Sequence, residues 1–327
     1  MTVLAELGEK RLIEELIAPL FNPRGDRDGV GDDCAVIDVP DGYRLAVSTD
    51  RVPADLIAYR LGILDHRGLG SYLARLNLSD IAAVGGSPHA LLLNAGLSSE
   101  MAIADLTAIC EGFAGAARRW GCEVVGGDLS ASPTLSLSAT ALGIVPKDGV
   151  LRRDGARPGE TVVACRPPGL TPAAFAALCD GPDVELTRAE RSLLEGQFAL
   201  EPMFDLIDPL RKHGVSGCMD NTDGLGQSLA ELASASGCAF VVSADLDLPA
   251  VVRKVALAKG VDPLALALSP GADFGLVATL PSGFEDLPPW LHPLGTVEAG
   301  EGVWLDAAGR RTRLEPSGWD HFLVPAA

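Results

Sequence analysis

The chain has 327 residues, of which 47% are hydrophobic, and it carries 26 basic against 44 acidic side chains. This apolar content excludes global disorder, and the net charge of −18 argues against partners such as nucleic acid or anionic membrane, which bind basic surfaces. No stretch approaches the roughly 20 apolar residues of a membrane span, and the seven cysteines form no C-x-x-C pair. We therefore expect a soluble, cytoplasmic protein with reduced thiols.

The first half of the chain predicts a sheet with helices packed on it. Apolar spacing indicates an amphipathic helix near residues 12–20, and the runs 34–39 and 43–48 flank a Pro-Asp-Gly turn that favours a β-hairpin. A helix over 69–84 and a buried strand over 89–97 follow. A second helix, capped by Ser98 or Ser99, is expected to end at Trp120, and strands are expected over 122–128 and 135–145.

A change in composition over residues 146–160 predicts a domain boundary near residue 148. Beyond it, strands expected at 161–165, 215–220, 239–244 and 274–280 alternate with helices that include 203–213 and 225–236. Mixed order of this kind is typical of an α/β or α+β fold. We therefore predict two domains, residues 1–148 and residues 149–327.

The candidate chemistry lies in aspartates that stand beside glycine or hydroxyl residues. Carboxylates gathered without matching lysines repel one another unless hard cations bind them, and oxygen-only ligands favour Mg²⁺ or Ca²⁺. Since Mg²⁺ held by a few carboxylates commonly accompanies a nucleoside triphosphate, the set points to phosphoryl transfer. The residues are Asp32, Asp33, Asp50, Asp80, Asp128, Asp220 and Asp223.

Each motif taken alone has a plainer interpretation. GDD and GGD are commonly turns, NLSD fits a solvated helix turn, and DNTDGLG fits a helix start at which Thr222 or Asp223 accepts amide hydrogen bonds. The chain also lacks a P-loop, a kinase glycine loop and the dinucleotide pattern G-x-G-x-x-G. A nucleotide would therefore be held through metal ions and backbone amides.

The ordered motifs GDDCAVI, STD, NLSDIAAVGGSP, GGD, SATALG, RRDGARPGE, DNTDGL and GWDHF resemble those of bacterial thiamine-monophosphate kinases across essentially the whole chain. That family is related to aminoimidazole ribonucleotide synthetase, selenophosphate synthetase and a hydrogenase-maturation dehydratase. The resemblance implies an N-terminal domain that pairs through its sheet in a homodimer. It also implies a C-terminal α/β domain, with Mg-ATP bound in the cleft between the two.

The resemblance also implies roles for individual residues. Asp80 and Asp223 are the expected catalytic residues, with Asp80 bridging several magnesium ions. The implied nucleotide contacts are Thr49, Gly127, Asp128, Arg153 and Thr222. The implied metal ligands are Asp33, Ser48, Thr49, Asp50, Asp80, Asp128, Asp220 and Asp223.

Three positions depart from the family pattern, all on the acceptor side. Ile57 stands in place of a substrate-contacting histidine, Ala272 in place of a glutamate and Pro316 in place of a tryptophan. One hypothesis is an ATP- and Mg-dependent kinase that converts thiamine monophosphate to thiamine diphosphate through a divergent pocket. Another is a phosphotransferase for a different small phosphorylated acceptor.

Two hypotheses from other classes also follow from these residues. A ligase or dehydratase of the same superfamily would work through a phosphorylated amide or imidate and release the phosphate. A nucleotide-binding dimer without activity would need no acids, so retention of the metal-binding aspartates argues against it.

Overall fold

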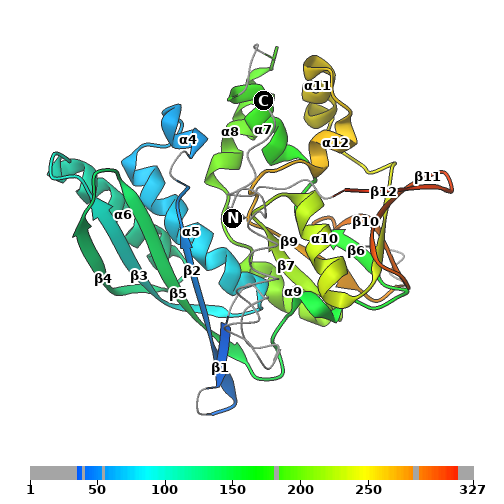
Figure 1. Cartoon of the computed structure of the whole chain (residues 1–327), viewed down its shortest axis with the longest axis horizontal. Helices are drawn as coiled ribbons and strands as arrows, with labels where there is room; N and C mark the ends of the chain where they lie inside the picture. The colour runs from blue at the N-terminus through cyan, green and yellow to red at the C-terminus, as the bar shows by residue number, and fades with distance from the viewer. Residues whose placement is uncertain (1–34, 39–40, 54–55, 180–183, 283–286, 316–327) are drawn as a thin grey trace, which may run out of the picture.

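The computed structural model describes residues 35–38, 41–53, 56–179, 184–282 and 287–315 (Figure 1). Several sequence predictions lie outside these residues: the opening helix, Asp32, Asp33, Pro316 and the GWDHF motif. The structure does not test these predictions, which rest on the sequence.

An N-terminal sheet of five strands has the order β1-β2-β5-β3-β4. Only β3 and β4 pair in parallel, and the other neighbours are antiparallel. The expected hairpin is confirmed as β1 and β2, and the long β5 alternates buried and partly exposed residues as its sequence predicts. The strands are β1 (Ala35–Asp38), β2 (Tyr43–Arg51), β3 (Ser87–Leu97), β4 (Glu123–Ala131) and β5 (Ser136–Pro146).

Helices α5 (His66–Ala83) and α6 (Ile103–Arg119) pack on one face of this sheet, and the short α4 (Ile57–Arg60) precedes them (Figure 1). Leu73 of α5 and Phe113 of α6 are almost fully buried in the resulting core. The predicted cap of α6 is wrong, because the helix begins after Ala102. The Ser98 hydroxyl instead accepts from the Glu100 amide, which forms a turn ahead of the helix.

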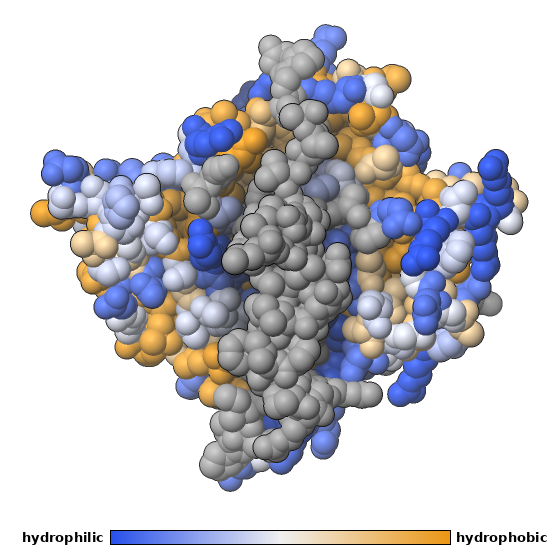
Figure 2. All heavy atoms as spheres, viewed as in Figure 1, coloured by the Kyte–Doolittle hydropathy of each residue, from blue (hydrophilic) through white to orange (hydrophobic). Residues whose placement is uncertain are grey.

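The C-terminal sheet has seven strands in the order β12-β11-β8-β10-β6-β9-β7. Sequence patterns found β6 to β9 but missed the last three strands of the chain, of which only β12 is both short and polar. The strands are β6 (Thr161–Ala164), β7 (Cys218–Asn221), β8 (Ala239–Ser243), β9 (Gly275–Leu280), β10 (His292–Glu298), β11 (Gly302–Ala307) and β12 (Arg310–Arg313). All four residues of β12 are exposed, and Figure 2 shows hydrophilic residues gathered on the projecting β11–β12 hairpin.

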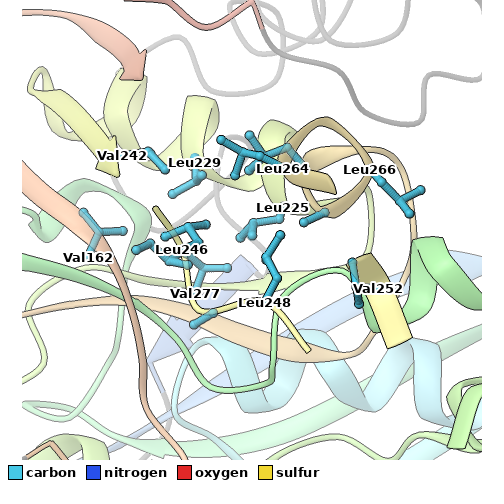
Figure 3. Packing of buried hydrophobic residues seen from close by; sticks show 14 of the residues in the cluster. Val162, Leu225, Leu229, Val242, Leu246, Leu248, Val252, Leu264, Leu266 and Val277 are labelled. Atoms are coloured by element: carbon cyan, nitrogen blue, oxygen red, sulfur yellow. The ribbon is translucent and has the colours of Figure 1, made fainter. Parts of the chain in front are cut away.

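Helices of the second half cover this sheet. They are α7 (Leu170–Leu178), α8 (Arg188–Glu195), α9 (Ile207–Lys212), α10 (Leu225–Ser236), α11 (Ala250–Lys259) and α12 (Pro263–Leu268), with 3₁₀ turns η2 (Arg153–Gly155), η3 (Gly196–Ala199) and η4 (Phe204–Leu206). Leu229 of α10 packs against Val242 and Val277 of the sheet (Figure 3). Full burial of each such side chain contributes about 1.5–3 kcal/mol to stability.

Helix α5 is the element that connects the two sheets. Its N-terminal part belongs to the core of the N-terminal sheet, whereas Ala82 and Ala83 share a buried cluster with Cys218 and Leu276 of the C-terminal sheet. The end of α5 that carries the predicted Asp80 is therefore held between the two sheets.

Candidate active site

Two serine hydroxyls bind two of the predicted metal-binding carboxylates around the C-terminal half of α5. Ser48, on β2, donates a hydrogen bond to Asp80. Ser79, the neighbour of Asp80 on the helix, donates to Asp220 Oδ2 of β7 at 2.6 Å. The structure thus brings Ser48, Asp80 and Asp220 together, although they come from three elements that are distant in sequence.

Asp50, on β2, and Asp223, in the turn between β7 and α10, both influence Tyr72 of α5. Burial is the main cause that raises the pKa of Tyr72, and the charges of Asp50 and Asp223 raise it further, against Arg75. Both carboxylates therefore lie within electrostatic reach of one phenol. Tyr72 stands eight residues before Asp80, about two helical turns, so both side chains lie on one side of α5. The sequence reading missed this tyrosine, although that spacing was available.

Thr49 and Asp128 lie apart from this group, on the sheet face that α5 does not cover, and Gly127 lies next to Asp128 in the edge strand β4. Alternation along β2 turns Ser48 inward and Thr49 outward, where the Thr49 hydroxyl donates to Ala139 O at 2.8 Å. The strand register places Asp128 opposite Asn94, three strands away from β2. At about 4.8 Å per strand step, Asp128 is about 14 Å across the sheet from β2.

Gly127 of the GGD motif has a packing reason to be glycine. Its φ is +149°, and a Cβ there would lie 1.7 Å from Leu93 O of the paired strand. Gly126 has no such constraint, since a Cβ would meet only Leu92 Cδ2 at 3.9 Å. The close contact of β4 with β3 therefore accounts for one glycine of the motif.

The DNTDGLG segment turns from β7 into α10. The N-cap residue of α10 is Gly224, with φ of +108°, and not Thr222 or Asp223. A Cβ on Gly224 would lie 2.8 Å from Ser269 O, so the turn requires glycine. Thr222 and Asp223 are half-buried at the start of α10, where backbone amides favour anions.

Arg153 lies in η2 and forms an ion pair with Glu231 of α10 at 2.6 Å. The two side chains are only 20% and 17% exposed. Arg153 is thereby held against the helix whose N-terminus carries Asp223.

A small cavity of about 20 Å³ lies beside Tyr72, and this volume holds a single water. The hydroxyl of Thr171 is buried and has no hydrogen-bond partner among the described residues. Ala272, at one of the departures from the family pattern, lines the cavity, and Ile57 follows the lining residue Leu56. The full lining is Leu56, Ala58, Leu64, Tyr72, Thr171, Phe175, Gln197, Phe198, Ala272 and Phe274.

Asp273 follows Ala272 and accepts hydrogen bonds from Asn221 Nδ2 at 2.9 Å and from the Gly275 amide at 2.7 Å. Desolvation raises its pKa from 3.8 to about 6, against these hydrogen bonds and the nearby Arg166 charge. His66 takes no part in the site. Its imidazole contacts the Tyr59 hydroxyl at 2.8 Å and Asp105 at 3.2 Å.

The donors around α5 fit Mg²⁺ in their chemistry, because they are carboxylate and hydroxyl oxygens. Within the described part of the chain, no group of three or more His, Cys, Asp or Glu side chains is close enough to hold an ion alone. Mg²⁺ commonly binds one or two carboxylates and completes its shell with water and substrate phosphates. Such an arrangement needs no dedicated protein cage.

Comparison with known proteins identifies the class first. Residues 31–145 match the family "AIR synthase related protein, N-terminal domain". The whole fold is similar to a solved structure described as "AaThiL complexed with AMPPCP and TMP", with a TM-score of 0.83, 27% identity and coverage of 98% of this chain and 99% of the other. The expected mixed α/β fold is therefore confirmed.

Similar proteins with assigned names narrow this class of protein to one enzyme family. The thiamine-monophosphate kinase of Synechococcus elongatus is 33% identical over 82% of this chain and 84% of its own length. That of Salmonella typhimurium is 29% identical over 97% and 99%. The chain belongs to the thiamine-monophosphate kinase family, as its motifs predict. The helices of the described residues include none with the length and apolarity to cross a membrane.

Proposed function

We propose that this protein transfers the γ-phosphoryl group of Mg-ATP to thiamine monophosphate, which yields ADP and thiamine diphosphate. The observation that carries the proposal is the placement of Asp80 and Asp220 around the C-terminal half of α5, where each accepts a hydrogen bond from a serine hydroxyl and where the helix contacts the cores of both sheets. Family membership supplies the named reaction, since the similar proteins are kinases of thiamine monophosphate.

Asp50, Asp80, Asp220 and Asp223 are the residues that would hold Mg²⁺, with Asp33 and Asp128 as further predicted ligands. Bound Mg²⁺ supplies neutralisation of phosphate charge. The acceptor phosphate of thiamine monophosphate is largely ionised at neutral pH, so its attack requires no general base. This agrees with the position of His66, which contacts Tyr59 and Asp105 at the opposite end of α5 from Asp80.

Nucleotide binding is assigned to two groups of residues. Thr222, at the start of α10, can donate its hydroxyl to a phosphate, and Arg153 lies beside the same helix. Thr49 and Asp128 lie on the uncovered face of the N-terminal sheet, and Gly127 adjoins Asp128 in β4. We infer that the edge strand β4 becomes part of an interface, because all nine of its residues are exposed and the apolar Val125 and Leu129 are 59% and 63% exposed. Figure 2 shows hydrophobic patches on the same side of the molecule.

We propose a homodimer that covers the exposed part of the N-terminal sheet, together with the predicted division of the chain into two domains. Residues 1–148 would form the dimerising, Mg-ATP-binding domain, and residues 149–327 the second α/β domain. β5 ends at Pro146 and the next sheet begins at Thr161, which is consistent with that boundary. The cytoplasmic location stays a prediction from the sequence.

The acceptor is assigned to the side of the site formed by Tyr72 and Ala272. A cationic, flat thiazolium ring favours aromatic faces and nearby negative charge, and Asp50 and Asp223 supply that charge. Ala272 lacks the carboxylate that the family pattern has there. A different small phosphorylated acceptor is the second candidate, and the departures at Ile57 and Ala272 are the observations that favour it.

The test is release of ADP across a panel of phosphorylated metabolites, with thiamine monophosphate included. Asp80→Asn and Asp223→Asn should lower turnover by at least about a hundredfold while the melting temperature stays near that of the wild type. Asp245→Asn, at an exposed aspartate, is the matched control and should leave turnover unchanged. Near-wild-type activity of the Asp80 variant would exclude the proposed site.

A further inference from the structure

Three residues of α5 reach in different directions from one helical segment. Asn77 Oδ1 accepts from the Asp50 amide at 2.9 Å, and Asn77 Nδ2 donates to Leu73 O at 3.0 Å. Asp80 accepts from Ser48 of the same strand β2. Ser79 points the other way and donates to Asp220 of β7. One segment of four residues therefore fixes the positions of β2 and β7 at once.

The Ser79–Asp220 hydrogen bond links α5, which carries Asp80, to β7, which carries Asp220. Ser79 and Asp220 are each only 1% exposed, although 141 residues separate them in sequence. A hydroxyl that donates to a buried carboxylate forms a short and strong hydrogen bond. The bond also gives a reason for serine here, because serine is a weaker helix former than alanine and the position is otherwise suited to a small apolar residue.

The chemistry of the donor matters as much as its position. An ionised carboxylate offers about four acceptor positions, and one hydroxyl occupies only one of them. A lysine or arginine at this position would neutralise the charge and compete with a cation. A serine orients the carboxylate without placing a positive charge beside it.

We propose that Ser79 is a positioning residue for the reaction: it orients the Asp220 carboxylate and sets its place relative to Asp80, so that both sheets contribute to one cation site. This inference rests on the proposed function, because it assumes that a magnesium–nucleotide complex binds between the sheets. Hydrogen-bonded partners of metal-binding carboxylates commonly change metal affinity by tenfold to a hundredfold when they are removed.

The experiment measures binding of a non-hydrolysable ATP analogue by calorimetry at several Mg²⁺ concentrations, together with melting temperatures. In Ser79→Ala, the half-saturating Mg²⁺ concentration should rise about tenfold. Ser79→Cys keeps a weaker donor of similar size and should fall between Ser79→Ala and the wild type. Ser71→Ala is the matched control on the same helix, because Ser71 contributes its backbone carbonyl to Arg75. Its Mg²⁺ dependence should be unchanged.

The outcomes separate the two proposals. If Ser79→Ala only lowers the melting temperature and its Mg²⁺ dependence stays within twofold of the wild type, the serine is a structural link and the positioning role is refuted. If Ser79→Ala does not fold, the same comparison is made with Ser79→Cys. If the wild-type protein binds no magnesium–nucleotide complex, the proposed function itself fails, and the positioning role fails with it.

Discussion

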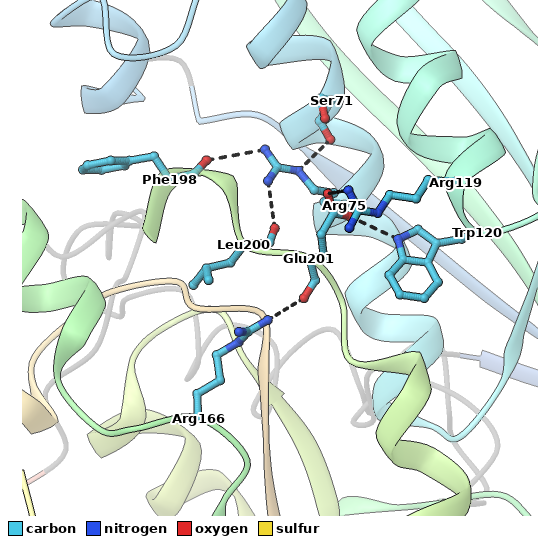
Figure 4. A network of polar contacts seen from close by, with 8 residues as sticks. All are labelled: Ser71, Arg75, Arg119, Trp120, Arg166, Phe198, Leu200 and Glu201. Atoms are coloured by element: carbon cyan, nitrogen blue, oxygen red, sulfur yellow. Dashed lines mark hydrogen bonds and ion pairs between the residues drawn. The ribbon is translucent and has the colours of Figure 1, made fainter. Parts of the chain in front are cut away.

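Arg75 offers the sharpest test of how α5 is anchored. Its side chain is 3% exposed, and it donates to Leu200 O at 2.8 Å and Phe198 O at 3.5 Å, and to Ser71 O of its own helix at 3.2 Å (Figure 4). The bonds to Phe198 and Leu200 tie the helix of Asp80 to the segment after α8. Arg75→Met keeps the apolar stem and removes every one of these donors.

The size of the effect follows from two opposing contributions. A buried carbonyl that loses its donor costs about 1–3 kcal/mol, with the long Phe198 bond at the low end. Burial lowers the pKa of Arg75, which shows that the charge itself is costly to bury, and its removal offsets part of the loss. We therefore expect Arg75→Met to lower the free energy of unfolding by about 2–3 kcal/mol.

Urea denaturation measures this change, and Arg119→Met is the control from the same network. Arg119 is 65% exposed and lies 3.5 Å from Glu201, a pair that contributes at most about 1 kcal/mol. If the two variants lose equal stability, buried carbonyl bonding by Arg75 does not anchor α5, and the reasoning is refuted.

Three further predictions concern backbone packing, pH and thiol reactivity. Gly127→Ala should destabilise the protein by several kcal/mol in urea denaturation, because its Cβ would overlap Leu93 O; a loss below about 0.5 kcal/mol would contradict the strand geometry. Asp273 has a pKa of about 6 in the folded state against an ordinary value of 3.8, so between these pH values the native state holds a proton that the unfolded state releases. The stabilisation that comes from this bound proton is therefore lost as pH rises from about 4 to 6. The stability of Asp273→Asn should fall less steeply over that range, and parallel curves would refute the assignment. Burial raises the pKa of Cys165 to about 12 whereas Cys110 is exposed, so Cys110→Ser should reduce alkylation at pH 8 and Cys165→Ser should leave it unchanged.

The sequence predicted most regular elements with long apolar periodicity. The helix expected at 225–236 matches α10, and the one expected at 69–84 differs from α5 by three residues at its start. The β11–β12 hairpin was missed because β12, with Arg310, Arg311 and Arg313, has no apolar alternation.

In the candidate site, the sequence revealed residues that belong to short motifs and missed residues that only the fold brings together. Short motifs identified Asp80 and Asp220, because NLSD and DNTDGLG can be recognised in the sequence without knowledge of the fold. Thr171 was missed because its place beside Tyr72 depends on a contact between segments about 100 residues apart, whereas the spacing of Tyr72 from Asp80 along one helix was a usable signal. The distance of Asp128 from β2 was equally hidden, since strand order in a sheet does not follow from the order of motifs.

The most direct test of the proposed activity is phosphorus NMR of the protein with Mg-ATP and thiamine monophosphate. Phosphoryl transfer predicts equal amounts of ADP and thiamine diphosphate, with inorganic phosphate at the level of an enzyme-free control. ADP that appears with an equal amount of inorganic phosphate, or tight Mg-ATP binding without any thiamine diphosphate, would contradict it.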